Sequence, residues 1–229
     1  NPALTNLLTQ LVTVSSLPLK GIENNFATDS SGFSTCRFVR WYNKKYGREI
    51  DNREWVKCHV MCGVETKIIS SVEMSGWAAN DTTYFVPLLE RTTQYHTVKE
   101  VSADKAYLSH KNLKATAKAN AVPYIPFKIN TAVPKGNNIW AEMYYYFMSN
   151  RGEFLDHYHK RSNVETAFSM IKAKFGDSVR SKSHIGQLNE VLCKVLCHNI
   201  CVIIQGIYEF GLAPTFGAEA RLALKSGEK

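Results

Sequence analysis

Apolar and polar positions along this 229-residue chain follow patterns that predict strands early and helices late. The expected strands share alternating or short apolar runs and lie at 25–29, 36–42, 55–74, 98–104 and 121–128, the second and third forming a hairpin. The expected helices share a helical apolar period and lie at 81–94, 109–119, 138–149, 153–175 and 185–210. Residues 1–24 are only weakly patterned. Three sequential strands followed by alternating helices and strands indicate a mixed α/β sheet.

The segment 158–172 has a polar face and an adjoining apolar face when it is drawn as a helix. At about 100° per residue, four polar residues share an arc of roughly 60°; they are Tyr158, Arg161, Glu165 and Lys172. The apolar stripe can pack on a core while the polar face looks into a cleft, and it consists of Val164, Ala167, Phe168, Ile171 and Phe175. The alternative is a surface helix in which Arg161 and Glu165 form an ordinary i,i+4 ion pair.

Two aspartates stand where predicted strands end. Asp29 precedes a small-residue turn, and Asp104 closes the alternating strand that begins at Val98. Aspartates at such positions often form turns or cap helices. If Asp29, Asp104 and Glu165 were gathered within a few Å, these three carboxylates would repel one another by about 1 kcal/mol per pair even in water. Such a cluster favours a divalent cation with hard oxygen ligands, Mg²⁺ or Mn²⁺, and hence phosphodiester chemistry.

The spacing Tyr-x2-Arg-x3-Glu-x6-Lys is that of the YREK motif of insertion-sequence DDE transposases, and Tyr158, Arg161, Glu165 and Lys172 match it at every position. The segment Asp104-Lys105-Ala106-Tyr107 is similar to the motif around that family's second aspartate. The chain therefore resembles the catalytic domain of these enzymes over about residues 22–205.

This resemblance implies an RNase H-like fold, an α/β mixed sheet with three antiparallel strands and then parallel strands, flanked by helices. It implies that Asp29, Asp104 and Glu165 are catalytic and hold two Mg²⁺ (or Mn²⁺) ions. The implied reaction is cleavage of double-stranded DNA at transposon ends and strand transfer to target DNA, by a homodimer assembled on DNA. The alternatives are an RNase H-like nuclease without strand transfer and an inactive transposase derivative that only binds DNA.

A net charge of +8 favours an anionic partner, nucleic acid before membrane. Directly after the Asp29 strand, lysines and arginines are interleaved with aromatic residues, a composition that suits a surface that binds along the DNA backbone. The basic residues assigned to DNA binding in this segment are Arg37, Arg40, Lys44 and Lys45. Tyr158, Arg161 and Lys172 are expected to contact DNA beside the scissile bond. For the basic segment, a solvated β-hairpin is the alternative interpretation.

The cysteines and several other polar residues are interpreted as structural or solvent-facing groups outside the candidate site. The six cysteines lack the spacing of a zinc site. Five of them are interpreted as buried thiols in a reducing, cytoplasmic compartment, near the nucleoid, and Cys36 is left unassigned. Asp81 is interpreted as the cap of the helix 81–94, and His157 and His159 as contacts to solvent or phosphate. His198 and Asn199 interrupt the apolar run 191–204, which argues against a membrane span.

Three parts are expected along the chain. Residues 1–24 are a lead-in or the remnant of a missing DNA-binding domain, and residues 25–210 are the catalytic domain. Residues 211–229, rich in alanine, glycine and charge, are expected to form a flexible tail.

Overall fold

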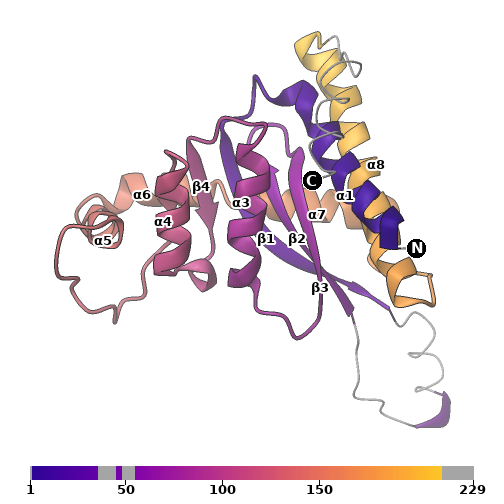
Figure 1. Cartoon of the computed structure of the whole chain (residues 1–229), viewed down its shortest axis with the longest axis horizontal. Helices are drawn as coiled ribbons and strands as arrows, with labels where there is room; N and C mark the ends of the chain where they lie inside the picture. The colour runs from indigo at the N-terminus through magenta and orange to yellow at the C-terminus, as the bar shows by residue number, and fades with distance from the viewer. Residues whose placement is uncertain (1, 36–44, 48–54, 213–229) are drawn as a thin grey trace.

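The computed structural model describes residues 2–35, 45–47 and 55–212, and its centre is a five-stranded sheet in the order β3-β2-β1-β4-β5 (Figure 1). The antiparallel half consists of β1 (Asn25–Ser34), β2 (Trp55–Gly63) and β3 (Ile69–Gly76). The parallel half adds β4 (Glu100–Ala103) beside β1 and β5 (Val122–Tyr124) beside β4. This order confirms the predicted mixed sheet of three antiparallel and then parallel strands flanked by helices.

β1 is the central strand, and its alternating residues face two separate cores. Phe26 belongs to the core on one side of the sheet, whereas Ala27 and Phe33 belong to the core on the other side. Asp29 pairs with Val60 of β2 and has the same parity as Ala27 and Phe33. It therefore lies on the second of these two faces.

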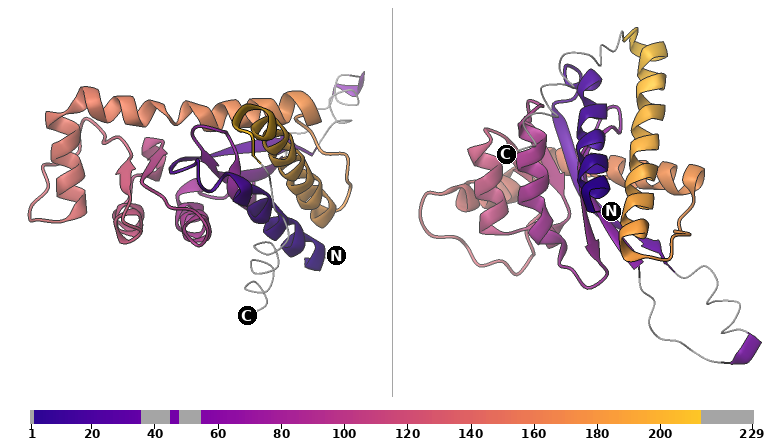
Figure 2. Two further views of the ribbon diagram at one scale, coloured as in Figure 1. Left: turned by 90° about the horizontal axis from the view of Figure 1, so that it is seen from above. Right: turned by 45° about the vertical axis from the view of Figure 1, so that its right-hand side comes forward.

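The face that carries Asp29 is covered by helices from both ends of the described chain, as Figure 2 shows. They are α1 (Pro2–Ser16), α7 (Ser162–Phe175) and α8 (His184–Phe210). Val12, Val164 and Val195, one from each helix, are completely buried against Val60 and its neighbours. Val164 and the other residues of the predicted stripe on α7 pack here; Phe175, the last of them, is partly buried.

The opposite face carries the second core. It is enclosed by α3 (Phe85–Thr93), α4 (His110–Lys118), α5 (Ile139–Ser149) and the start of α6 (Arg151–His159). Two short 3-10 turns, η2 (Asp81–Tyr84) before α3 and η3 (Lys105–Tyr107) after β4, link the sheet to this layer. A third, η1 (Leu17–Leu19), follows α1. The crossovers through this layer are what bring β4 beside β1 and place Asp104 near Asp29.

The predicted helix 153–175 is two helices, and the prediction of one continuous helix is wrong. α6 ends at His159 and α7 begins at Ser162. Between them the backbone makes i→i+3 hydrogen bonds, from Arg161 N to Tyr158 O at 3.0 Å and from Val164 N to Arg161 O at 3.0 Å. This tighter winding has about three residues per turn, so Arg161 lies almost directly over Tyr158.

The weakly patterned start of the chain forms a helix, contrary to the sequence expectation. α1 lies along the edge strand β3 and beside α8. This arrangement is visible in both Figure 1 and Figure 2. Its threonines, serines and valines are poor helix formers, so the packing of Leu8 and Val12 supplies what propensity lacks. The proposed domain boundary at residue 25 thus separates α1 from the elements on which it packs.

Asn199 joins α8 to both of its neighbours. Its Oδ1 accepts a hydrogen bond from Ile69 N at 2.9 Å, and its Nδ2 donates to Ile69 O, Ser15 Oγ and Val12 O. His198 is bonded to Lys67 O at 2.9 Å. By length and composition alone, α8 is apolar enough to cross a membrane, which weakens the sequence argument against a span. A core helix passes the same test, and half of this one is buried.

Several expectations fall on other parts of the chain. Cys58 and Cys62 are buried as predicted, whereas Cys193 and Cys197 on α8 are exposed and Cys201 is partly exposed, so their assignment as buried thiols is wrong. The predicted strand 36–42, Cys36 and nearly all of the tail lie outside the described residues.

Candidate active site

Asp29 lies in the middle of β1, facing α7, with its side chain 23% exposed. The expectation that it ends its strand is wrong, because pairing with β2 continues β1 to Ser34. Asp29 Oδ1 accepts a hydrogen bond from the backbone N–H of Ser30 at 2.8 Å. Burial raises the pKa of Asp29; the Ser30 N–H and Arg161 oppose that shift, whereas Glu165 and Asp104 add to it. Asp29 is therefore within electrostatic reach of both other predicted acids.

Arg161 joins Asp29 to Glu165. Its Nη1 lies 2.9 Å from Asp29 Oδ2, and its Nη2 lies 2.7 Å from Glu165 Oε1. The Glu165 side chain, in the first turn of α7, is 53% exposed, while that of Arg161 is 21% exposed. The predicted i,i+4 pair is thus present, and the same guanidinium also reaches across to the sheet, so the helix carries more than a solvated ion pair.

Asp104 directly follows β4, the parallel neighbour of β1, and precedes η3. Its Oδ1 accepts a hydrogen bond from Lys105 N at 2.7 Å, which caps the η3 turn. Tyr107, the last residue of the Asp104 motif, is 1% exposed and packs in the second core, which fixes this turn to the fold. Asp104 therefore has both the capping role common for such residues and a place beside Asp29.

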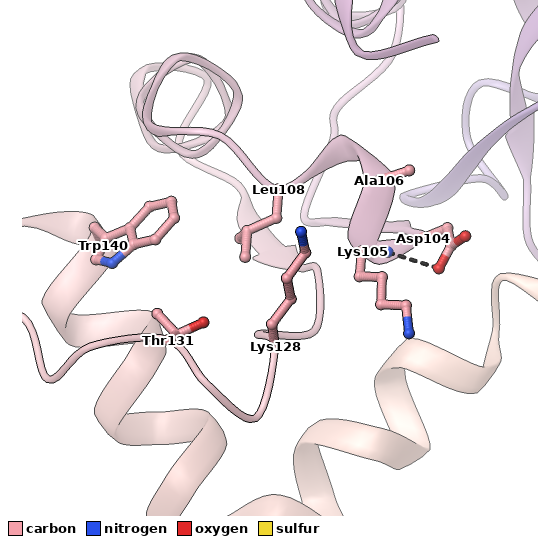
Figure 3. Close-up of a pocket in the computed structure, with 7 residues that line it drawn as sticks. All are labelled: Asp104, Lys105, Ala106, Leu108, Lys128, Thr131 and Trp140. Atoms are coloured by element: carbon pink, nitrogen blue, oxygen red, sulfur yellow. Dashed lines mark hydrogen bonds between the residues drawn. The ribbon is translucent and has the colours of Figure 1, made fainter.

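A pocket of about 490 Å³ opens beside Asp104. Figure 3 draws the residues that line it, with Lys105 and Asp104 coming from the β4–η3 turn, Lys128 from the segment after β5, and Trp140 from α5. The indole of Trp140 is stacked on the His110 ring at 4.0 Å. Two lysines and an aromatic wall therefore adjoin one of the three acids.

The turn between α6 and α7 is tied to β4 by a charged cluster. Glu100 Oε2 lies 2.8 Å from His157 Nδ1 and accepts a hydrogen bond from Lys160 Nζ at 3.0 Å. Ser102 Oγ donates to His157 O at 3.0 Å, and the His157 ring stacks on Tyr124 at 4.3 Å. Burial opposes ionisation of Glu100, but the hydrogen bonds from His157 and Lys160 outweigh it and lower its pKa.

His157 is therefore part of the fold, and its interpretation as a contact to solvent or phosphate is wrong; His159 is exposed. No local pattern pairs Glu100 with His157, because 57 positions separate them. The cluster holds the backbone from which Tyr158 and Arg161 project, so Glu100, His157 and Lys160 are the supporting residues that sequence reasoning missed.

The predicted DNA-binding residues are spread along α6 and α7. The Tyr158 ring lies 5.9 Å from the Arg161 guanidinium carbon, and Lys172 Nζ lies 5.3 Å from the Phe33 ring, near the end of β1. Lys45 is exposed, with its Nζ 5.5 Å from the Tyr46 ring. Arg37, Arg40 and Lys44 lie outside the described residues.

Asp81 is on the other face of the sheet. It pairs with Lys57 at 2.5 Å and lies 3.6 Å from Nδ1 of the buried His59. Asn80 caps η2 instead, by accepting a hydrogen bond from Thr82 N. The interpretation of Asp81 as the cap is therefore wrong.

The donor chemistry of Asp29, Asp104 and Glu165 suits a hard divalent ion, which prefers carboxylate oxygens and keeps some waters. Within the described ranges, no three His, Cys, Asp or Glu side chains lie close enough together to hold an ion. Arg161 stands between two of the acids, and the Glu165 carboxylate is exposed enough to turn. The residues therefore fit a metal site in the type of their donor atoms.

One comparison with known proteins bears on these features. Residues 21–200 match the family described as transposase DDE domain. The matched segment contains Asp29, Asp104, Glu165 and the whole YREK-like motif, as well as all five strands of the sheet. Proteins of this family act on DNA and generally use divalent metal ions. Since the match spans most of the chain and agrees with the mixed sheet, this chain belongs to the transposase DDE domain family.

Proposed function

We propose that this chain is a DNA transposase that cleaves DNA at transposon ends and joins the freed 3′ end to target DNA. The observation that carries the proposal is the Arg161 bridge, which brings Asp29 of β1 and Glu165 of α7 together. Asp104, on the neighbouring strand β4, supplies the third acid. Membership of the family supplies the class of reaction.

In this proposal Asp29, Asp104 and Glu165 hold Mg²⁺ or Mn²⁺, two ions as the family resemblance implies. The bound ions supply activation of the attacking oxygen and stabilisation of the leaving oxygen in an in-line displacement. The chain's own residues contribute by fixing the positions of the three acids. Two acids stand on adjacent parallel strands, and the third stands on a helix whose start is fixed to β4 by Glu100.

The remaining residues of the motif grip DNA. Arg161 and Lys172 provide positive charge at the two ends of α7, and Tyr158 provides a ring for contact with a nucleotide near the cut. Lys105 and Lys128 extend this positive surface on the other side of Asp104. Together they support a path for a DNA strand along α7 and past Asp104, and synapsis of two ends by a DNA-assembled dimer.

Strand transfer distinguishes this proposal from its alternatives. The full chain is incubated in Mn²⁺ with a target plasmid and duplexes taken from the DNA that flanks its gene, ending in either a 3′-hydroxyl or a 3′-dideoxy nucleotide. Joined products that require the 3′-hydroxyl are the expected result. Nicking without joining would identify a nuclease, and binding without either reaction would identify an inactive derivative.

A further inference from the structure

Arg161 occupies an unusual position for a cation. It is the residue before α7, at the positive end of the helix dipole, where the backbone carbonyls of Lys160 and Arg161 already accept hydrogen bonds from Asn163 N and Val164 N. Serine, threonine, aspartate and asparagine are preferred there because their side chains accept hydrogen bonds from the first N–H groups of a helix. Arg161 makes no such capping bond. Its placement is stabilised instead by the two carboxylates that it contacts.

The two contacts use the acids' own coordinating atoms. Asp29 Oδ2 and Glu165 Oε1 accept from the two terminal nitrogens of one guanidinium, at 2.9 and 2.7 Å. A cation of charge +2 would need lone pairs of the same two carboxylates and the space between them. Either cation would also relieve the electrostatic repulsion between the Asp29 and Glu165 carboxylates, which the guanidinium contacts together. The Arg161 guanidinium and a metal ion therefore compete for the carboxylate oxygens of Asp29 and Glu165.

We propose that Arg161 is an internal counter-ion that holds Asp29 and Glu165 together until divalent metal replaces it. This inference rests on the proposed function for the identity of the metal-binding acids. It extends that function because it gives Arg161 two successive partners, the carboxylates before metal loading and a DNA phosphate after it.

The surroundings of Arg161 allow this exchange without a backbone movement. Glu100, His157 and Lys160 fix the turn on which Arg161 stands. In the bridging position the guanidinium carbon already lies 5.9 Å from the Tyr158 ring, a cation–π contact that does not depend on the two carboxylates. Only the side chain has to rotate, and the released guanidinium stays within reach of a strand bound along α7.

The test is Mn²⁺ affinity, measured by calorimetric titration of the full chain without DNA. Arg161→Ala should bind Mn²⁺ about five- to tenfold more tightly than the wild type, because no competing cation remains. Its melting temperature should be lower than that of the wild type in EDTA and rise more on addition of Mn²⁺. Arg161→Gln carries the same affinity prediction if the alanine variant does not fold. Arg151→Ala, an exposed arginine at the start of α6, is the matched control and should behave as the wild type.

Equal or weaker Mn²⁺ binding by both Arg161 variants would overturn the inference. So would tight binding that survives Glu165→Gln in the Arg161→Ala background, because the ion would then lie elsewhere. The outcome is independent of catalysis. Tighter binding in a chain that neither cuts nor joins DNA would overturn the proposed function alone, whereas unchanged affinity in an active enzyme would overturn this inference alone.

Discussion

Arg161 and Asp29 are 132 positions apart in the chain, and their side chains meet at 2.9 Å. This contact links the helix motif to the central strand of the sheet. It joins an acid in the middle of β1 and the polar residues at the start of α7 into one candidate site. The residues that hold it in place, and the charges around it, lead to separate predictions.

Glu100→Gln should loosen the turn that carries Arg161. The variant keeps the shape of the side chain but loses the charge that His157 and Lys160 bind. We expect a loss of about 1 kcal/mol in the free energy of unfolding, since the pairs are partly exposed. We also expect about tenfold slower DNA cleavage with unchanged DNA affinity, because Glu100 positions Arg161 and touches no substrate. Glu90→Gln on α3 is the control.

The pH dependence of this effect follows from the lowered pKa of Glu100. A carboxyl whose pKa is lower in the folded state contributes stability above its unfolded pKa and loses it as pH falls through the folded value. The stability difference between Glu100→Gln and the wild type should therefore shrink in acid. A difference that stays constant down to the acid limit of folding would contradict the assignment.

Asn199→Ala should be strongly destabilising, by about 2 to 4 kcal/mol, because it leaves buried groups of α1 and β3 without partners. Urea unfolding measures the change. Asn189→Ala removes a partly buried bond from Thr5 in the same helix pair and should cost much less. Similar losses in the two variants would show that Asn199 does not join α8 to the sheet.

His96 should make the protein sensitive to mild acid. Burial, with a smaller effect of Lys20, lowers its pKa to about 4. Its Nε2 is bonded to Ser16 Oγ at 2.9 Å, and its ring packs on Phe26. The unfolded chain binds this proton near pH 6.5 and the folded chain does not, so stability falls between about pH 6.5 and 4, by up to about 1.4 kcal/mol per unit.

Urea unfolding at pH 7 and pH 5 checks this for His96→Gln, which should lose less stability between the two values than the wild type. His184→Gln, at the exposed start of α8, should keep the wild-type difference. The same loss in all three proteins would rule out His96 as a source of the acid sensitivity. His59, whose pKa burial also lowers to about 4, accounts for part of the remainder.

Lys172→Ala should weaken DNA binding and reduce the slope of log affinity against log salt by about one. Fluorescence anisotropy at several salt concentrations gives that slope. Lys118→Ala, an exposed lysine at the end of α4, provides a comparison on the opposite layer. An unchanged slope for Lys172→Ala would exclude a phosphate contact and leave Lys172 as a partner of the Phe33 ring.

Local pattern predicted most of the fold. Strand alternation and helical period located β1, β4 and β5 apart from their ends, and the stripe from Val164 to Ile171 is buried as expected. The expected single strand 55–74 is wrong, because it is two strands, β2 and β3, joined by a turn. α1 was missed although Leu4, Leu8 and Leu11 recur at helical spacing, and because its serines, threonines and valines have low helix propensity, its stability comes from packing on α8 and β3. The strand ends are set by pairing with neighbours, which no local pattern contains.

The candidate site was predictable as residue types and not as contacts. The motif spacing identified Arg161 and Glu165, and expected strand ends identified Asp29 and Asp104. The bridge from Arg161 to Asp29 and the support of Glu100 for the turn join distant segments, so they depend on the topology of the sheet. The break between α6 and α7 was missed, although the apolar residues on its two sides belong to different cores, Phe154 to the second core and Val164 to the core on the Asp29 face.

The most direct test of the account is metal-dependent DNA cleavage by three single variants, Asp29→Asn, Asp104→Asn and Glu165→Gln, each confirmed as folded. The account predicts that every variant loses more than about a hundredfold in rate while it still binds DNA. Full activity in any one of them would contradict the assignment of that acid, and with it the central claim that β1, β4 and α7 together form the active site.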